Sequence, residues 1–575
     1  MNIPRPEYPR PQMARPVWTN LNGQWEFDFD FSDSGKARGL AQAEHLNGSI
    51  LVPFCPESRL SGIGFTDFIP AVWYKRRFNA AQADLNGRLL LHFGAVDYEC
   101  EVWVNGKTVG SHQGGYTPFT LDITEAAVPG ENLLTVYARD DVRSMRQPRG
   151  KQSSELHSHG CDYTRTTGIW QTVWLEPVPS TYIADYRVTP DYRNGKITIE
   201  AEIKGCPEGL MLTADASLEG RPAGRVSVKA APHVFLELPL SLIDLWEPGH
   251  PSLYDLTLSL SGGDRVTGYF GLRGIEVQDG AVLLNGKPIF QRLVLDQGFY
   301  PDGIYTAPSD DALKADILRC QDLGFNGARL HQKVFEPRFL YWADKLGYLC
   351  WGEYASWGID ITRPEALAVF LPQWLESVKR DFNHPSIIGW CPFNETNVGY
   401  DCQTAKDTVR TVYQMTKLTD PSRLVIDASG YVHTGQTDLY DVHDYEQDPA
   451  VMAEHYARTE QGESFENFPQ WGKWDGKLPL FVSEYGGTWW CPGVQGGWGY
   501  GETPQTEEEV CRRYCGLTEV LLDNPKICAF CYTQPYDIEQ EQNGLFRYDR
   551  TPKFSPEIYR RIRETNLRPA AIEAR

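Results

Sequence analysis

Apolar and polar residues alternate in short runs over about the first 180 positions. Clear runs occupy residues 23–29, 71–78 and 88–93, and the run at 100–104 ends at Asn105-Gly106, a pair typical of tight hairpin turns. Gly, Pro, Asn and Asp interrupt these runs, and no helical period persists. The pattern predicts a jelly-roll-like antiparallel β-sandwich over residues 1–180.

The same strand rhythm continues to about residue 275 in a shorter segment. Residues 196–203 and 252–260 alternate between apolar and polar side chains. A segment of about 95 residues with this pattern is typical of a seven-stranded sandwich. We therefore expect an immunoglobulin-like β-sandwich over residues 181–275.

The hydrophobic period changes at about residue 276, where short apolar runs begin to alternate with amphipathic helices. This order predicts parallel strands joined by helical crossovers, and eight strands favour a closed (β/α)8 (TIM) barrel over residues 276–575. The strands are expected at 288–291, 327–330, 348–351, 387–393, 423–427, 439–443, 480–484 and 527–532. Helices are expected at 310–323, 337–346, 366–381 and 507–522, the last with Thr506 as its N-cap.

Composition narrows the possible partners and the compartment. The net charge of −21 disfavours nucleic acid and anionic membranes, and no apolar run approaches the length of about 18 residues that a membrane helix needs. Thirteen scattered cysteines and a start without a signal-peptide core favour the cytoplasm. Aromatic residues make up 12% of the chain, enough to fill sandwich cores or to stack on sugars; composition alone favours the cores.

Two glutamates end apolar barrel strands and are the candidates for chemistry. Glu395 follows the fourth predicted strand, next to Asn394, and Glu484 ends the seventh. In such barrels the carboxyl ends of the strands surround the active site, so both side chains can reach one bond. Paired carboxylates on a scissile bond are typical of glycoside hydrolysis, whereas most glutamates are solvated surface groups.

Several longer motifs point to a known family. They are Asn383-His-Pro-Ser-Ile-Ile-Gly-Trp with Asn394-Glu395, Ser483-Glu484-Tyr-Gly, Trp246-Glu-Pro-Gly-His-Pro-Ser-Leu-Tyr, Asn285-Gly-Lys-Pro and Asp162-Tyr-Thr-Arg-Thr-Thr-Gly-Ile-Trp-Gln. With these motifs in this order, the chain resembles glycoside hydrolase family 2, which contains β-galactosidases, β-glucuronidases and β-mannosidases.

The resemblance implies a role for each matching residue. Glu395 would be the general acid/base and Glu484 the nucleophile of a retaining enzyme, with carboxyl groups about 5–5.5 Å apart. The remaining residues would bind the substrate or support the nucleophile: Asn394 at the sugar 2-hydroxyl, Asp162 at other sugar hydroxyls, and Tyr445 and Arg329 beside Glu484.

The sequence departs from the family pattern at positions that would recognise the sugar. The lysine that binds a uronic acid in related β-glucuronidases is replaced by Leu545, with Arg547 and Lys333 as possible substitutes. His331 and Asp296 stand where the family pattern differs, and they are either sugar contacts or a buried hydrogen-bonded pair that braces the rim.

Metal binding and sugar stacking also differ from the family pattern. Glu353 matches a metal-binding position of β-galactosidases, but the histidine of that motif is absent, so we expect no metal and no cofactor. The tryptophan that ends the eighth strand in many relatives is missing as well. Trp489, Trp490 or Trp357 could stack on the sugar instead, or could pack a loop.

Together these features predict a cytoplasmic, exo-acting, retaining β-glycosidase that acts on a small glycoside or an oligosaccharide. A β-galactoside or the similar α-L-arabinopyranoside is the preferred substrate, and the alternative is a β-glucuronide, a β-galacturonide or the substrate of another family 2 glycosidase. A carbohydrate-binding protein that has lost catalysis is the alternative from another class, although it would have no reason to keep both glutamates. A homo-oligomer is possible, but no interface signal stands out.

Overall fold

The computed structural model describes residues 3–206, 208–396, 402–431, 433–493 and 496–574. Its first unit is a β-sandwich of a four-stranded and a six-stranded sheet. Trp25 and Tyr74 of the larger sheet share one core with Leu91 and Leu175 of the smaller sheet. The sheets are, in spatial order, β1 (Thr19–Asn20), β12 (Val173–Val178), β5 (Arg88–Phe93) and β9 (Phe119–Asp122), and β3 (Gly48–Val52), β2 (Gly23–Phe29), β4 (Ala71–Ala80), β10 (Gly130–Arg139), β7 (Glu99–Val104) and β8 (Lys107–Gln113).

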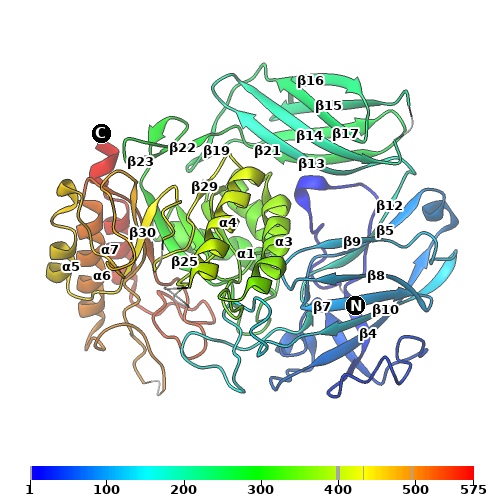
Figure 1. Cartoon of the computed structure of the whole chain (residues 1–575), viewed down its shortest axis with the longest axis horizontal. Coiled ribbons are helices and arrows are strands. Elements are labelled where there is room, and N and C mark those ends of the chain that lie inside the picture. The colour runs from blue at the N-terminus through cyan, green and yellow to red at the C-terminus, as the bar shows by residue number, and fades with distance from the viewer. Residues whose placement is uncertain (1–2, 207, 397–401, 432, 494–495, 575) are drawn as a thin grey trace.

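The second unit is the predicted seven-stranded immunoglobulin-like sandwich, drawn in green at the top of Figure 1. Its strands alternate between buried and half-exposed positions, as the sequence pattern requires of sheets with one face on a core. One sheet contains β13 (Tyr182–Asp191), β14 (Lys196–Lys204) and β17 (His233–Pro239). The other contains β16 (Arg221–Lys229), β15 (Met211–Leu218), β20 (Tyr254–Leu260) and β21 (Arg265–Phe270).

The third unit is the predicted TIM barrel, on the left of Figure 1. Its eight parallel strands follow chain order around the sheet, and a seam lies between β29 and β30, where Asp438 N donates to Val425 O (2.9 Å). The strands are β25 (Gln291–Asp296), β26 (Gly327–Leu330), β27 (Leu349–Glu353), β28 (Ile387–Cys391), β29 (Leu424–Val425), β30 (Tyr440–Asp444), β31 (Leu480–Tyr485) and β32 (Ile527–Tyr532).

The position predicted for the first barrel strand was wrong. Residues 287–288 belong to a small entrance sheet of β22 (Ile275–Gln278), β23 (Ala281–Leu284) and β24 (Lys287–Pro288). A tight turn at Asn285 and Gly286, both with positive φ, reverses the chain there, so the barrel strand starts only at Gln291. The predicted strand starts three residues too early, because a buried parallel strand has no alternation to mark its start.

The helices cover the outside of the barrel. They are α1 (Asp310–Asp322), α2 (Pro337–Leu346), α3 (Pro364–Asp381), α4 (Gln403–Thr419), α5 (Pro449–His455), α6 (Glu507–Leu522) and α7 (Pro556–Asn566). Four of them, α1, α2, α3 and α6, match the four predicted segments closely. Thr506 caps α6, since its hydroxyl accepts from Glu509 N, as predicted. Within the described residues, no helix combines the length and the apolar character that crossing a membrane would require.

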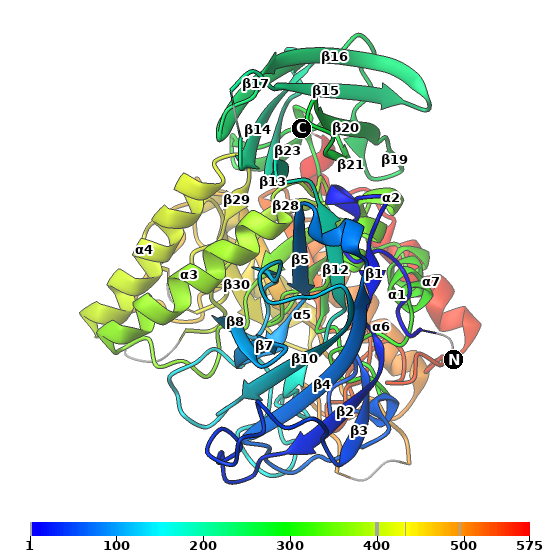
Figure 2. The same cartoon turned by 90° about the vertical axis from the view of Figure 1, so that its right-hand side faces the viewer.

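Asp344 of α2 joins the barrel to the second sandwich. Its buried carboxylate accepts hydrogen bonds from Tyr269 of β21 (2.7 Å), His384 (2.6 Å) and Ser386 N (2.9 Å). Its carbonyl oxygen accepts from the indole of Trp246 (2.8 Å). Figure 2 shows the second sandwich seated on this end of the barrel. Loss of the carboxylate would leave several buried donors without an acceptor, which is strongly unfavourable.

We therefore predict that Asp344→Ala lowers the free energy of unfolding by about 2–4 kcal/mol. The measurement is the urea midpoint followed by tryptophan fluorescence. Asp322→Ala, at an exposed position that ends α1, is the matched control and should change stability by less than about 0.5 kcal/mol. Equal midpoints for the two variants would contradict the role given to Asp344.

Candidate active site

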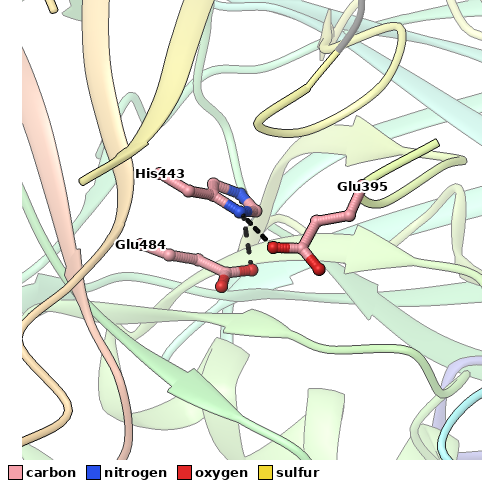
Figure 3. Close-up of side chains that lie close together, drawn as sticks. All are labelled: Glu395, His443 and Glu484. Atoms are coloured by element: carbon pink, nitrogen blue, oxygen red, sulfur yellow. Dashed lines mark hydrogen bonds and ion pairs between the residues drawn. The ribbon is translucent and has the colours of Figure 1, made fainter. Parts of the chain in front are cut away.

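Glu395 and Glu484 face each other at the carboxyl ends of the barrel strands, and His443 lies between them (Figure 3). The ligand atoms of these three side chains all lie within 4.8 Å of one another. Glu395 follows β28, His443 belongs to β30 and Glu484 to β31. The side chain of Glu395 is 19% exposed and Glu484 is only 4% exposed, so the pair lies at the bottom of an opening rather than on the surface.

The chain leaves β28 in an unusual conformation that directs Glu395 inward. Asn394 forms a bridge with Ser429, and Glu395 N donates to Ser429 O (2.8 Å). Glu395 itself has a φ of 45°, a left-handed conformation that is uncommon outside glycine and is often found at functional sites. The indole of Trp357 donates to Asn394 O (3.0 Å) and holds the same turn from the other side.

The buried guanidinium of Arg329 connects the residues around the pair. From β26 it donates to Glu353 (2.7 Å), to Ser483 O (2.7 Å), to Glu484 Oε1 (3.2 Å) and to Asn394 Oδ1 (3.1 Å). Its exposed fraction is zero. Because arginine presents fixed planar donors, this set of bonds orients Asn394 and Glu484 together.

Glu484 is held in its ionised form. Burial alone would raise the pKa of Glu484, but the positive charges of His443, His331 and Arg329 and a hydrogen bond from Tyr445 lower it to about 2. The hydroxyl of Tyr445 lies 2.5 Å from Glu484 Oε2, and the tyrosine ring stacks on Tyr500 at 3.5 Å. Since burial lowers the pKa of His331, the permanent positive charge in this group is that of Arg329.

His443 was not predicted from the sequence. Its Nδ1 lies 2.8 Å from Glu395 Oε1, and its Nε2 lies 3.4 Å from Glu484 Oε1 and 3.0 Å from the hydroxyl of Ser429. Burial lowers the pKa of His443, but the charge of Glu484 and the hydrogen bond and charge of Glu395 raise it above its usual value. The only signal in the sequence was its place near the end of a barrel strand, two residues before Tyr445.

A segment of the first sandwich forms one wall of the site. Arg149 pairs with Asp162 through both carboxylate oxygens (3.1 and 3.3 Å), and Arg149 N donates to Trp357 O (2.7 Å). Arg149 and Trp357 line a pocket of about 330 Å³ together with Glu395. Asp162 therefore lies beside this wall, but its carboxylate is already paired with an arginine.

The other predicted site residues occupy different surroundings. Glu353 accepts from Arg329 and from His331 Nδ1 (3.0 Å), so these residues form a buried brace beneath the pair. Asp296 ends β25, and its carboxylate accepts from Gly298 N (2.9 Å), while His331 contacts it only through its backbone N–H. Of the two alternatives for His331 and Asp296, the hydrogen-bonded pair is present only through this backbone contact.

The tryptophans proposed for sugar stacking also differ in their placement. Trp489 is half-buried, and its indole nitrogen has no hydrogen-bond partner among the described residues. Trp490 is 8% exposed and packs into the barrel core. Trp357 is the tryptophan that lines the pocket with Glu395.

Glu395, His443 and Glu484 also offer the ligand types of a cation site. Two carboxylates and an imidazole suit a divalent ion such as Zn²⁺. However, both ring nitrogens of His443 and one oxygen of each carboxylate already interact with one another. A pair of carboxylates, of which one is kept ionised, suits glycosyl transfer better than it suits metal binding.

Comparison with family models gives three matches in chain order. Residues 64–179 match the model "Glycosyl hydrolases family 2, sugar binding domain", residues 181–273 match "Glycosyl hydrolases family 2", and residues 275–565 match "Glycosyl hydrolases family 2, TIM barrel domain". The last of these alone covers about half of the chain.

The individual relatives differ in the activity that their names give. The chain is 28% identical over 391 residues to a beta-galactosidase of Thermoanaerobacter pseudethanolicus, covering 64% of this chain and 49% of that protein. It is 26% identical over 430 residues to a putative beta-glucuronidase of Formosa agariphila, covering 70% and 49%. The chain thus spans about half the length of the curated relatives it matches.

The fold is also that of a solved structure over nearly the whole chain. A beta-glucuronidase of Lactobacillus rhamnosus superposes with a TM-score of 0.80 at 21% identity, covering 97% of this chain and 98% of that one. The order of the three structural units along the chain agrees with the order of the three family matches. The chain belongs to glycoside hydrolase family 2.

Proposed function

We propose that the protein is an exo-acting retaining β-glycosidase in which Glu484 is the nucleophile and Glu395 the general acid/base. The observation that carries the proposal is the approach of the two carboxylates, with an oxygen of each within 4.8 Å of the other. Retaining enzymes place these groups about 5–5.5 Å apart, and inverting enzymes about 6.5–9.5 Å apart to admit a water molecule. The spacing supports direct attack on the sugar.

In the first step, an oxygen of Glu484 attacks the anomeric carbon while Glu395 gives its proton to the departing glycosidic oxygen. In the second step, Glu395 takes a proton from water, and the resulting hydroxide breaks the bond between the sugar and Glu484. The low pKa of Glu484 keeps it ready for attack. Arg329 and Tyr445, which contact its two oxygens, hold it in place.

Asn394 is oriented to bind a sugar hydroxyl. Its amide oxygen accepts from Arg329, so its amide nitrogen is directed elsewhere and can donate to the 2-hydroxyl. A donor at that position acts most strongly as positive charge develops on the ring. His443 contacts both glutamates, so its imidazole partly offsets the negative charge of each.

A neutral glycon, with a galactoside as the first choice, is supported by the surroundings of Leu545 and Lys333, two of the positions considered for a uronate. Leu545 is buried in the apolar core. The ammonium of Lys333 donates to Gly298 O (2.6 Å) and Tyr305 O (2.8 Å), and burial lowers its pKa to about 7. Arg547 donates to Pro552 O (2.5 Å). The ammonium of Lys333 is therefore already bonded, whereas Arg547 lies at an exposed position.

Glu484→Gln removes the nucleophile without changing the shape of the site. We expect turnover of a 4-nitrophenyl glycoside to fall by about 10⁴-fold or more, with an unchanged melting temperature. Glu395→Gln should reduce the rate most for glycosides with poor leaving groups, because dinitrophenolate departs without a proton. Glu454→Gln, at an exposed position of α5, is the control and should behave like the wild type. Full activity of Glu484→Gln would refute the assignment.

A panel of nitrophenyl glycosides tests the glycon and the stereochemistry. We expect the highest kcat/KM with the β-galactoside or the α-L-arabinopyranoside. Proton NMR should show the β-anomer as the first product of the β-galactoside, because two displacements restore the configuration. Strong turnover of the glucuronide with none of the galactoside would contradict the preference, and an initial α-anomer would contradict the mechanism.

His443→Gln tests the electrostatic link between the imidazole and the nucleophile. The charge of His443 lowers the pKa of Glu484, so its removal should raise that pKa from about 2 towards the usual 4.5. The nucleophile then becomes protonated at higher pH, and the acidic limb of kcat/KM should move up by about 1–2 pH units. His455→Gln is the control, since His455 pairs with Asp444 instead. An acidic limb that coincides with that of the wild type would disprove the link.

A further inference from the structure

A loop that follows the nucleophile in the chain places an aromatic ring on the tyrosine that bonds to the nucleophile. Tyr500 belongs to the glycine-rich stretch between β31 and α6. Its ring stacks on the ring of Tyr445, with the ring centres 3.5 Å apart and the planes 8° from parallel. At this distance and angle the two rings overlap almost completely. Tyr500 therefore covers one face of Tyr445.

Tyr445 is the residue through which this stack can act on the chemistry. Its hydroxyl donates to Glu484 Oε2 (2.5 Å) and lies 3.2 Å from the hydroxyl of Thr533. Tyr445 comes directly after β30, so its side chain extends from the end of a strand. A tyrosine side chain rotates about two bonds, and any rotation displaces the hydroxyl at the far end of the ring. A ring packed flat against it limits that rotation.

The backbone of Tyr500 is bound to the chain directly after the nucleophile. Tyr500 N donates to Gly487 O (2.9 Å), and Tyr500 O accepts from Trp489 N (3.3 Å). Aromatic rings by themselves favour an offset or edge-to-face arrangement over full overlap. The position of Tyr500 on Tyr445 is therefore set by these backbone bonds rather than by the attraction between the rings.

Gly501 brings the loop close to a second contact of Tyr445. Gly501 has a φ of 72°, and a Cβ at this position would lie 2.5 Å from Gln447 Cγ, so only glycine fits here without a shift. The amide of Gln447 donates to Tyr445 O (3.1 Å). The loop thus packs against both the ring of Tyr445 and a side chain that holds its backbone.

Trp498 connects the same loop to the first sandwich. Its indole donates to Gly160 O (2.5 Å), and its ring packs edge-on against Tyr500, with ring centres 5.5 Å apart. Its backbone pairs with the loop after β32, since Trp498 N donates to Gln540 O (3.0 Å) and Trp498 O accepts from Gln542 N (2.8 Å). Tyr500 is therefore held between the chain after the nucleophile and a residue bonded to another domain.

We propose that Tyr500 is a positioning residue that holds the ring of Tyr445 where its hydroxyl donates to Glu484. The inference rests on the glycosidase function proposed above and adds a residue that acts on the nucleophile through Tyr445. Without the stack, the ring of Tyr445 rotates more freely and donates to Glu484 for only part of the time. The hydrogen bond from Tyr445 helps to lower the pKa of Glu484, so its partial loss raises that pKa.

The experiment is a double-mutant cycle, measured with the nitrophenyl glycoside that the wild type hydrolyses fastest. Tyr500→Leu removes the flat ring, so kcat/KM should fall about 10-fold and its acidic limb should move to higher pH. Tyr445→Phe removes the hydroxyl and should lower kcat/KM by about 10- to 100-fold. When Tyr445→Phe is already present, Tyr500→Leu should change kcat/KM by less than about 2-fold, because the bond that the stack supports is gone.

Two further variants separate the stack from other effects. Tyr500→Phe keeps the ring and should restore kcat/KM to within about 3-fold of the wild type. Phe31→Leu is the matched control, because it also replaces a stacked ring by leucine. Phe31 is exposed and stacks on Phe29 of the first sandwich (5.1 Å), so its loss should change neither the rate nor the pH profile. Melting temperatures check that each variant is folded.

The outcomes separate this inference from the proposed function. If Tyr500→Leu lowers kcat/KM by the same factor with and without the hydroxyl of Tyr445, the positioning role is wrong. It is also wrong if Tyr500→Phe loses as much activity as Tyr500→Leu, because the hydroxyl of Tyr500 then matters rather than the stack. The glycosidase function stands in both cases. If the wild type hydrolyses no glycoside at all, the proposed function itself fails.

Discussion

The buried guanidinium of Arg329 is the interaction on which the rest of the site depends. It is fully enclosed, and its hydrogen bonds join β26 to β27, to the turn after β28 and to β31. Removing such a charge from water is unfavourable, and the carboxylates of Glu353 and Glu484 offset it. The positions of Asn394 and Glu484 are therefore coupled, since both are bound to the same rigid group.

The first sandwich contributes side chains to the candidate site and does more than pack beside it. Its segment between β10 and β12 supplies Arg149, Lys151 and Asp162 to the rim, and Tyr163 donates to Glu541 across the domain boundary. The role of the second sandwich is structural. Asn383 accepts from Val188 N (2.8 Å), and Trp246 donates to Asp344 O, so these motif residues hold the domains together at the end of the barrel away from the site.

Buried carboxylates at the site differ in pKa because their partners differ. Glu484 has Arg329, His443 and Tyr445 as neighbours, and its pKa is low. Glu541, in the loop after β32, is equally buried, and burial raises its pKa; the hydrogen bonds that it accepts from Tyr163 and Asn543 come from neutral groups. A retaining mechanism needs one carboxylate that is always ionised, and the arrangement around Glu484 provides it.

The sequence alone determined the domain plan and the position of the glutamate pair along the chain. Alternating residues marked both sandwiches, the change of period marked the barrel, and Glu395 and Glu484 stood at strand ends, where barrel geometry directs side chains into the site. Only the tertiary structure decided which other side chains meet them. His443 lies 48 positions from Glu395, and Tyr163 lies 378 positions from Glu541. Periodicity reports local backbone geometry, so contacts across such separations leave no mark in it until the domains have packed.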